Sequence, residues 1–148
     1  MAVSQTGQSQ LPKLYSSIKA LIESMEVIPT AESLPSYSQL KESPNKFFEL
    51  FSEAVYKYNI ICDTLQKLQH ANAIIVKVLN DLMSPDCKES YNIKTIYVKN
   101  FTQIKSECVA LIACYETAKA SSETIVKFFN SAQFTITSGR FDGTSANY

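Results

Sequence analysis

Glycine is almost absent from this 148-residue sequence, where it occurs only at positions 7, 139 and 143. The prolines at 12, 29, 35, 44 and 85 are therefore the only strong breakers of secondary structure between Gly7 and Gly139. Residues 45–84 and 86–138 contain neither breaker, and neither segment shows the period-two alternation of a half-buried strand. The sequence predicts an all-α protein.

An excess of charge of one sign is also missing. Fourteen lysines and arginines balance fourteen acidic residues, and Arg140 is the single arginine. A balanced chain creates no field that would draw it to a polyanion, and the forked donor that dominates phosphate and base-edge recognition is nearly lacking. We therefore predict no nucleic-acid partner.

The residue patterns that catalysis or metal binding needs are missing too. His70 is the only histidine, and the sequence has no glycine-rich phosphate loop, nucleophile elbow or Glu-x-x-His pair. We predict that the chain is not an enzyme and that it uses no cofactor and no metal. We expect His70 to be a solvated surface residue.

The sequence lacks an apolar run long enough for a signal peptide or a membrane span, and its four cysteines form no CxxC pair. We therefore expect free thiols in an intracellular, cytoplasmic setting. Cys108 and Cys114 lie in or beside an apolar stripe, where a thiol acts as a small hydrophobe. Cys87 lies in a polar loop and is the thiol that we expect to react.

What the sequence does contain is a heptad spacing of apolar residues, sustained over two long segments. It predicts an antiparallel helical bundle with long helices at about 45–83 and 92–133 and coiled-coil-like packing at a shallow angle. Additional apolar residues beside the stripe widen it to the face that a bundle needs. In the first helix the stripe is Phe47, Phe51, Ala54, Tyr58, Ile61, Leu65, Leu68, Asn72, Ile75, Leu79 and Leu82. In the second it is Tyr97, Phe101, Ile104, Cys108, Leu111, Tyr115, Ala118, Ser122, Ile125, Phe129 and Ala132.

A shorter copy of the stripe predicts a third helix at about 10–28, with Pro12 in its first turn and Pro29 just past its end. We expect one turn of helix at 36–42, and Ser90 or Asn92 as the cap of the last helix. Together these elements make a single helical bundle domain at 1–134, followed by a flexible C-terminal tail at 135–148.

The loop SPDCKESY is short enough to fold the two long helices into an antiparallel hairpin. A loop centred near residue 88 selects the register in which the numbers of facing residues sum to 176. This register pairs Phe47 with Phe129, Leu68 with Cys108, and Asn72 with Ile104.

The short helix, roughly 27 Å long, cannot cover a hairpin of roughly 60 Å. Run antiparallel to the second helix, it should cover the open end of the hairpin, against residues 47–68 and 108–132. The loop end would then keep a bare apolar groove, which we predict to bind a protein partner, either another chain or a second copy. The predicted partner-binding residues are Asn72, Ile75, Leu79, Leu82, Met83, Ile93, Ile96, Tyr97 and Phe101.

Asn72 interrupts the stripe where a hydrophobe is expected. A buried amide at such a position costs stability, and its best-attested use is to fix register or helix number. Our hypothesis gives Asn72 this role. The alternative is that Asn72 faces water or bonds to Ser17 or Ser24 of the first helix.

These patterns favour a non-enzymatic protein–protein interaction module, a small helical subunit or adaptor of an intracellular complex that works by helix-in-groove binding or bundle completion. Two alternatives stay open. One is a lipid or membrane-surface binder, which the scattered lysines disfavour. The other is a self-assembling coat or filament subunit.

Overall fold

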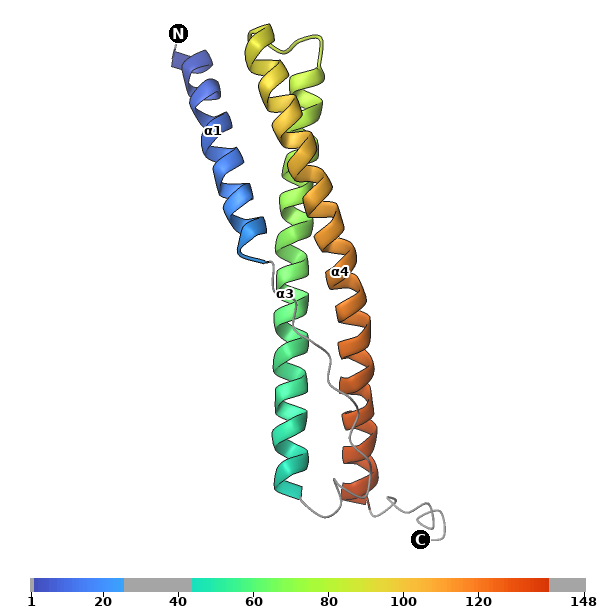
Figure 1. Ribbon diagram of the computed structural model, residues 1–148. Coiled ribbons are helices and arrows are strands. Elements are labelled where there is room, and N and C mark those ends of the chain that lie inside the picture. Colours follow the sequence, from blue (N-terminus) through green and yellow to red (C-terminus); the bar gives the residue numbers. More distant parts are fainter. Residues whose placement is uncertain (1, 26–43, 139–148) are drawn as a thin grey trace. The chain divides into compact units, whose positions relative to one another are not determined.

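The computed structural model describes residues 2–25 and 44–138. Three helices make up most of these ranges: α1 (Ala2–Glu23), α3 (Pro44–Met83) and α4 (Tyr91–Ser138) (Figure 1). No strand occurs within the two described ranges. The predicted all-α helical bundle is confirmed.

α1 differs from its predicted bounds at both ends. It begins at Ala2 rather than near residue 10, and Pro12 lies inside the helix. An interior proline removes one backbone donor, and its ring crowds the carbonyl four residues earlier, so the prediction had placed Pro12 in the first turn instead. The helix ends at Glu23 rather than at 28, since the Ser24 hydroxyl donates to the Leu21 carbonyl at 2.6 Å and closes the last turn. Residues 26–28 and the turn predicted at 36–42 lie outside the described residues.

The two long helices begin where their start signals place them. α3 starts at Pro44, as expected for a proline at the first helical position. Ser90 caps α4, because its hydroxyl accepts a hydrogen bond from the Ile93 amide at 3.3 Å; Asn92, the other candidate cap, lies inside the helix. α4 continues to Ser138, five residues past the predicted end, since no breaker occurs before Gly139. The predicted tail therefore starts with helix at 135–138, and residues 139–148 are not described.

The chain forms two compact units. Unit 1 contains Met1–Ile28 and Thr64–Tyr115, and unit 2 contains Pro29–Asp63 and Glu116–Tyr148. Unit 1 therefore holds α1 and the parts of α3 and α4 that flank the connecting loop. Unit 2 holds the first half of α3 and the last part of α4. That the bundle is a single domain over 1–134 stays a prediction.

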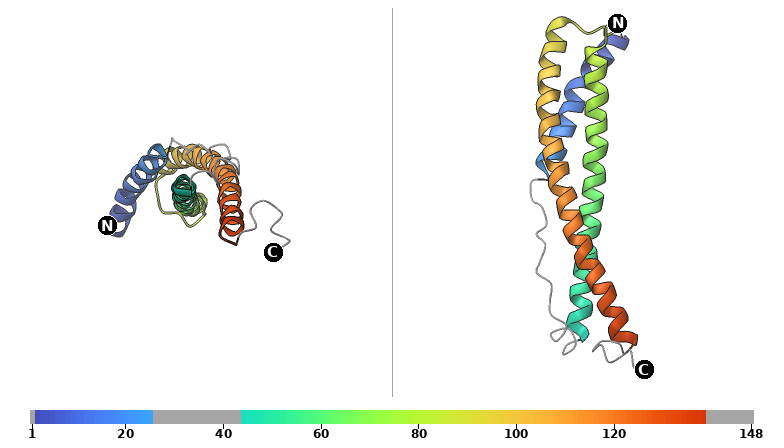
Figure 2. Two further views of the ribbon diagram at one scale, coloured as in Figure 1. Left: turned by 90° about the horizontal axis from the view of Figure 1, so that it is seen from below. Right: turned by 90° about the vertical axis from the view of Figure 1, so that its right-hand side faces the viewer.

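Unit 1 is a three-helix assembly. Its α1 runs antiparallel to α3 and in the same direction as α4, and it lies beside both helices near the loop (Figures 1 and 2). The Tyr15 ring packs edge-on against Phe101 with the centroids 5.6 Å apart, and the Tyr115 hydroxyl donates to the Met25 carbonyl at 3.3 Å. The buried apolar side chains of this unit are Ile18, Ile22, Met25, Leu65, Leu68, Ala71, Ile75, Leu79, Leu82, Phe101, Ile104, Cys108 and Tyr115.

The predicted position of the short helix is wrong. We expected α1 to cover the open end of the hairpin, and it packs instead on the loop-end segments within unit 1. The expectation assumed that the link between α1 and α3 keeps their neighbouring ends close. The eighteen residues from 26 to 43 can extend about 60 Å, at roughly 3.3–3.6 Å per residue, so the link does not impose that position.

Unit 2 is held together by aromatic rings. Phe129 packs edge-on against Phe47 at 5.7 Å between centroids and stacks on Phe51 at 5.6 Å with an interplanar angle of 10°. Phe47, Ala54, Phe129 and Ala132 are buried, and Leu50, Ile125, Val126 and Phe128 pack against them. Offset and edge-on pairs of this kind add to the burial of their area.

The predicted register is confirmed by one contact in each unit. In unit 1 the Cys108 thiol donates to the Leu68 carbonyl at 3.4 Å. In unit 2 the rings of Phe47 and Phe129 touch. Both pairs have residue numbers that sum to 176, so the heptad phase and the length of the loop were enough to align the helices.

Replacing Phe129 with Ala should lower the free energy of unfolding by about 3–5 kcal/mol, because it removes a buried ring that three other rings contact. Phe48→Ala is the matched control, since this ring is 48% exposed and should cost far less. Urea titration followed by circular dichroism measures both. Equal losses for the two variants would show that Phe129 is not the centre of the unit 2 core.

Candidate interaction site

The nine predicted partner-binding residues do not share one environment. Ile75, Leu79, Leu82 and Phe101 are buried in unit 1, which corrects the expectation that the loop end keeps a bare groove. Asn72, Ile93 and Tyr97 are partly buried. Met83 and Ile96 are exposed, at 70% and 51% of their surface. The four buried residues belong to the core that α1 helps to close, so only the other five can offer surface to a partner.

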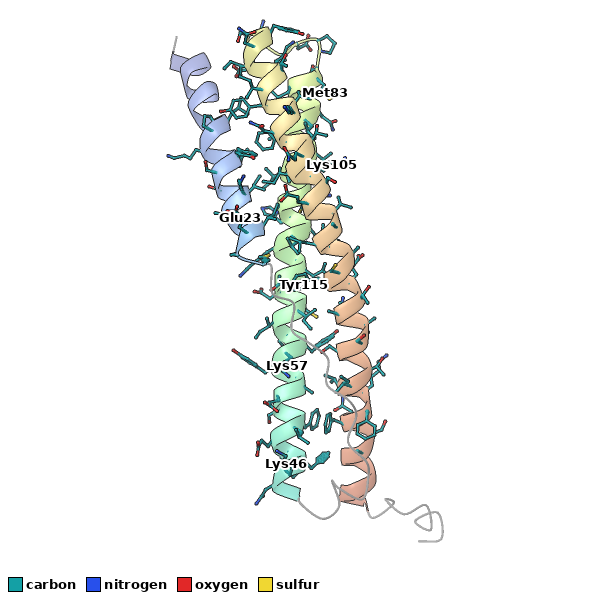
Figure 3. The ribbon with its side chains drawn as sticks, in the orientation of Figure 1. Glu23, Lys46, Lys57, Met83, Lys105 and Tyr115 are labelled. Atoms are coloured by element: carbon teal, nitrogen blue, oxygen red, sulfur yellow. The ribbon has the colours of Figure 1, made fainter. Side chains whose placement is uncertain are left out.

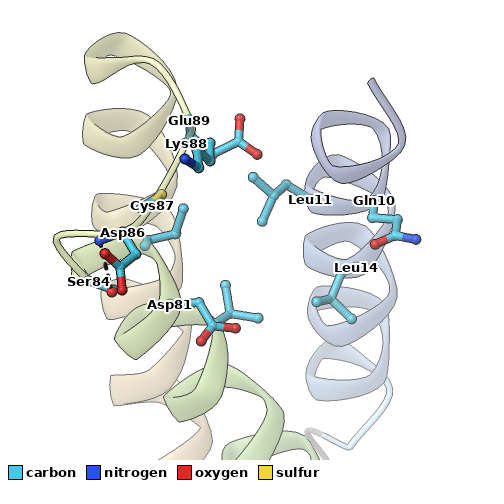
Figure 4. Close-up of a pocket in the computed structure, with 11 residues that line it drawn as sticks. Gln10, Leu11, Leu14, Asp81, Ser84, Asp86, Cys87, Lys88 and Glu89 are labelled. Carbon is cyan, nitrogen blue, oxygen red and sulfur yellow. Dashed lines mark hydrogen bonds between the residues drawn. The ribbon is translucent and has the colours of Figure 1, made fainter. Parts of the chain in front are cut away.

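A cavity of about 440 Å³ remains at the loop end of unit 1, between α1 and the segment where α3 passes into the loop (Figure 4). Leu11 and Leu14 of α1 line it on one side (Figure 4), and Val78 and Leu82 of α3 supply the other apolar lining residues. The remaining lining residues are Gln10, Asp81, Ser84, Asp86, Cys87, Lys88 and Glu89. The cavity thus has an apolar floor and a polar rim.

The rim is held in place by the turn that ends α3. The Ser84 amide donates to the Asp81 carbonyl at 3.3 Å, and the Cys87 amide donates to the Ser84 carbonyl at 3.1 Å. The Asp86 amide donates to the Ser84 hydroxyl at 3.2 Å. Pro85 cannot continue the helix, so these hydrogen bonds between residues two or three apart form the turn that borders the cavity. The side chains of residues 86–89 are thereby placed on the rim rather than in a helix.

The rim carries more acid than base. Asp81, Asp86 and Glu89 face a single lining base, Lys88. Lys77 lies 3.4 Å from the Asp81 carboxylate and offsets its charge, although an exposed pair of this kind adds little to stability. The last turn of α3 has no basic residue, although the carbonyl end of a helix favours a cation. With Lys77 counted, the rim keeps an excess of one negative charge.

Exposed apolar side chains flank the same loop. Met83 is the last residue of α3 (Figure 3). Tyr91, 78% exposed, is the first residue of α4. Ile96 follows in the second turn of α4. Met83, Tyr91, Ile96 and the lining of the cavity together form what we call the loop-end surface.

Sequence reasoning missed two parts of this surface. Leu11 and Leu14 were assigned to the open end of the hairpin, and only the observed packing of α1 in unit 1 brings them to the loop. The acidic rim was visible in the letters DLMSPDCKES, but its residues join one cavity only after the turn at Ser84 is formed.

Asn72 has no bond to either serine of α1. Its carbonyl oxygen Oδ1 is buried and has no hydrogen-bond partner, while the Ser24 hydroxyl is engaged with Leu21. The alternative that Asn72 bonds to Ser17 or Ser24 is therefore wrong. The role of Asn72 in fixing register or helix number stays a prediction.

The thiols divide by exposure. All four cysteines are free, as expected; Cys114 is exposed, Cys62 and Cys87 are partly buried, and Cys108 is buried. Burial raises the pKa of the Cys108 thiol and also that of the Tyr115 hydroxyl. His70 is exposed, as predicted. Cys87 lies in the wall of the cavity, so its predicted reactivity would report on that cavity.

Replacing Asn72 with Leu should raise the free energy of unfolding by about 1–2 kcal/mol, because the substitution removes a buried oxygen without a partner and adds apolar burial. Asn80→Leu, on the exposed face of α3, is the matched control and should change little. Urea titration gives the stability, and light scattering gives the mass. A more stable variant with altered mass would support the role in helix number, and unchanged mass would count against it.

The stability of the chain should fall as the pH rises above about 9, in part because of Cys108. The folded state holds this thiol protonated, so its contribution is fully present below the unfolded pKa of 9.0 and is lost as pH rises through the raised folded pKa. Cys108→Ala should show a shallower fall between pH 8 and pH 10.5 than the unsubstituted chain. Parallel pH profiles of unfolding free energy would contradict the protected state of this thiol.

Within residues 2–25 and 44–138, no three or more histidine, cysteine or acidic residues come together in a way that could hold a metal ion. None of the helices described is both long and apolar enough to cross a membrane. Comparison with protein-family models, with curated proteins and with solved structures found no match to the sequence. The inference of function therefore rests on the geometry of the loop-end surface.

Proposed function

We propose that the chain is a non-enzymatic protein–protein interaction module, a helical subunit or adaptor of a larger complex, and that it binds its partner through the loop-end surface. The observation that carries the proposal is the cavity of about 440 Å³, together with exposed Met83, Tyr91 and Ile96 on the helix ends that the same loop joins. Exposed large apolar residues and a partly apolar cavity are features of surfaces that a partner covers.

The form of binding differs from the one that the sequence suggested. The predicted binding residues Ile75, Leu79, Leu82 and Phe101 are buried in unit 1, where α1 packs against the segments of α3 and α4 that carry them. Binding at the loop-end surface leaves α1 in place, because the cavity lies between α1 and the loop. We therefore propose that the partner inserts apolar side chains beside α1 and leaves the three-helix packing intact.

The loop-end surface favours a protein over a bilayer. A helical membrane-surface binder uses lysines around its apolar face to hold anionic headgroups. Here Asp81, Asp86 and Glu89 lie beside the apolar floor. These acids would be repelled by an anionic membrane surface, so vesicle flotation with phosphatidylserine should recover little of the chain.

Replacing Ile96 with Asp should reduce retention of the native partner by at least tenfold, since it places a charge in the apolar part of the surface. Val109→Asp is the matched control: Val109 is 46% exposed on the same helix but lies about 20 Å further along it. Retention on the tagged full chain from extracts of its own cells, quantified by mass spectrometry, measures both.

Loss of the same retained protein in both variants, or in neither, would contradict binding at the loop end. Light scattering of the purified chain separates a closed complex from self-assembly. A mass that grows without limit with concentration would favour the coat or filament alternative.

A further inference from the structure

We infer that the partner presents a short basic and apolar peptide segment to the loop-end cavity, with a leucine, isoleucine or methionine next to a lysine or arginine. This inference rests on the proposed function and adds the chemistry of the partner. It follows from the shape of the cavity, from the charge on its rim and from the end of α3 beside it.

The size and floor of the cavity suit apolar side chains. A volume of about 440 Å³ falls within the range of roughly 300–1,000 Å³ that binding pockets span. Leu11 and Leu14 of α1 and Val78 and Leu82 of α3 supply carbon surface to the lining. A leucine-sized group that enters between α1 and α3 would lose apolar surface to both helices, which favours binding.

The charge of the rim then favours particular residues next to the inserted apolar side chain in the partner's sequence. With three acids and one base among the lining residues, the formal charge of the lining is −2, and Lys77, 3.4 Å from the Asp81 carboxylate, reduces the local excess to −1. The partial negative charge at the carbonyl end of α3 adds to it, because no base in the last turn offsets that end. A lysine or arginine beside the buried group would meet favourable potential, whereas an acidic residue would meet repulsion.

A second copy of this chain fits less well than a different protein. The chain has no net charge. Within the described ranges, Lys94 beside Ile96 lies at the loop end itself, and Lys46 beside Phe48 is paired with Glu49. Charge complementarity therefore favours a basic segment of another protein, and self-association becomes an outcome of the test.

The test uses the full chain and a display library of random twelve-residue peptides. Peptides retained after selection should be enriched in lysine and arginine next to leucine, isoleucine or methionine. Their affinity, measured by fluorescence polarisation, should fall with ionic strength. On a chain that carries Cys114→Ser, which removes the exposed thiol, a bound peptide should also slow labelling of Cys87 in the cavity wall.

Two variants and one control locate the site. Asp86→Lys combined with Glu89→Lys should weaken binding at least tenfold, because it reverses the rim. Glu23→Lys combined with Glu107→Lys makes the same change in net charge at exposed positions of unit 1 outside the cavity lining, and it should have little effect. Leu11→Trp should abolish binding by filling the cavity; an unchanged circular dichroism spectrum and melting temperature would show that the fold survives.

The outcomes separate this inference from the proposed function. If the selected peptides lack basic residues but still lose binding to Leu11→Trp, the predicted basic character of the partner is wrong. The proposed function as an interaction module would then be retained. Three results would overturn the inference. The first is peptide binding that neither the rim reversal nor Leu11→Trp weakens, and the second is a selection that yields no cavity-dependent peptide. The third is a dimer of this chain that Leu11→Trp dissociates. Failure of the Ile96→Asp experiment, by contrast, overturns the proposed function itself.

Discussion

The packing of α1 against the loop-end segments of α3 and α4 is the constraint on which the functional reading depends. Tyr15 on Phe101 fixes one part of this contact, and the hydrogen bond from Tyr115 to the Met25 carbonyl fixes the end of the helix. Buried Ile18 and Ile22 lie between these two points in the chain. The apolar stripe becomes core where α1 packs on it, and the loop-end cavity lies beside Gln10, Leu11 and Leu14 of α1. The position of α1 thus determines which apolar residues remain accessible to a partner.

Much of the fold could be predicted from the sequence, for reasons that can be named. The lack of glycine, together with a heptad phase that never slips, gave two long helices, and the short loop set a register that Leu68–Cys108 and Phe47–Phe129 both confirm. The placement of α1 was not available. Its stripe of apolar residues matches any segment of the hairpin equally well, and an eighteen-residue link is too long to choose between them. Because α1 was placed on the wrong segment, four buried core residues were predicted to contact a partner: Ile75, Leu79, Leu82 and Phe101.

The candidate site was partly predictable for the same reason. Met83 and Ile96 were predicted as partner-binding residues, and their exposure keeps them available to a partner. The rim of the cavity depends on a turn held by Ser84, whose bonds are local but whose neighbours come from α1. Asn72 was predictable only in part. Its position in the apolar stripe follows from the sequence, but the missing hydrogen-bond partner of its amide oxygen is seen only when the neighbouring side chains are in place.

The position of α1 can be tested directly by hydrogen–deuterium exchange with mass spectrometry, comparing the unsubstituted chain with Ile18→Asp. A charge at this buried position should loosen α1 from its partners. We expect faster exchange in residues 64–83 and 91–115, with little change in 47–63 and 116–132. Faster exchange confined to 47–63 and 116–132 would place α1 on the open end of the hairpin and contradict the account.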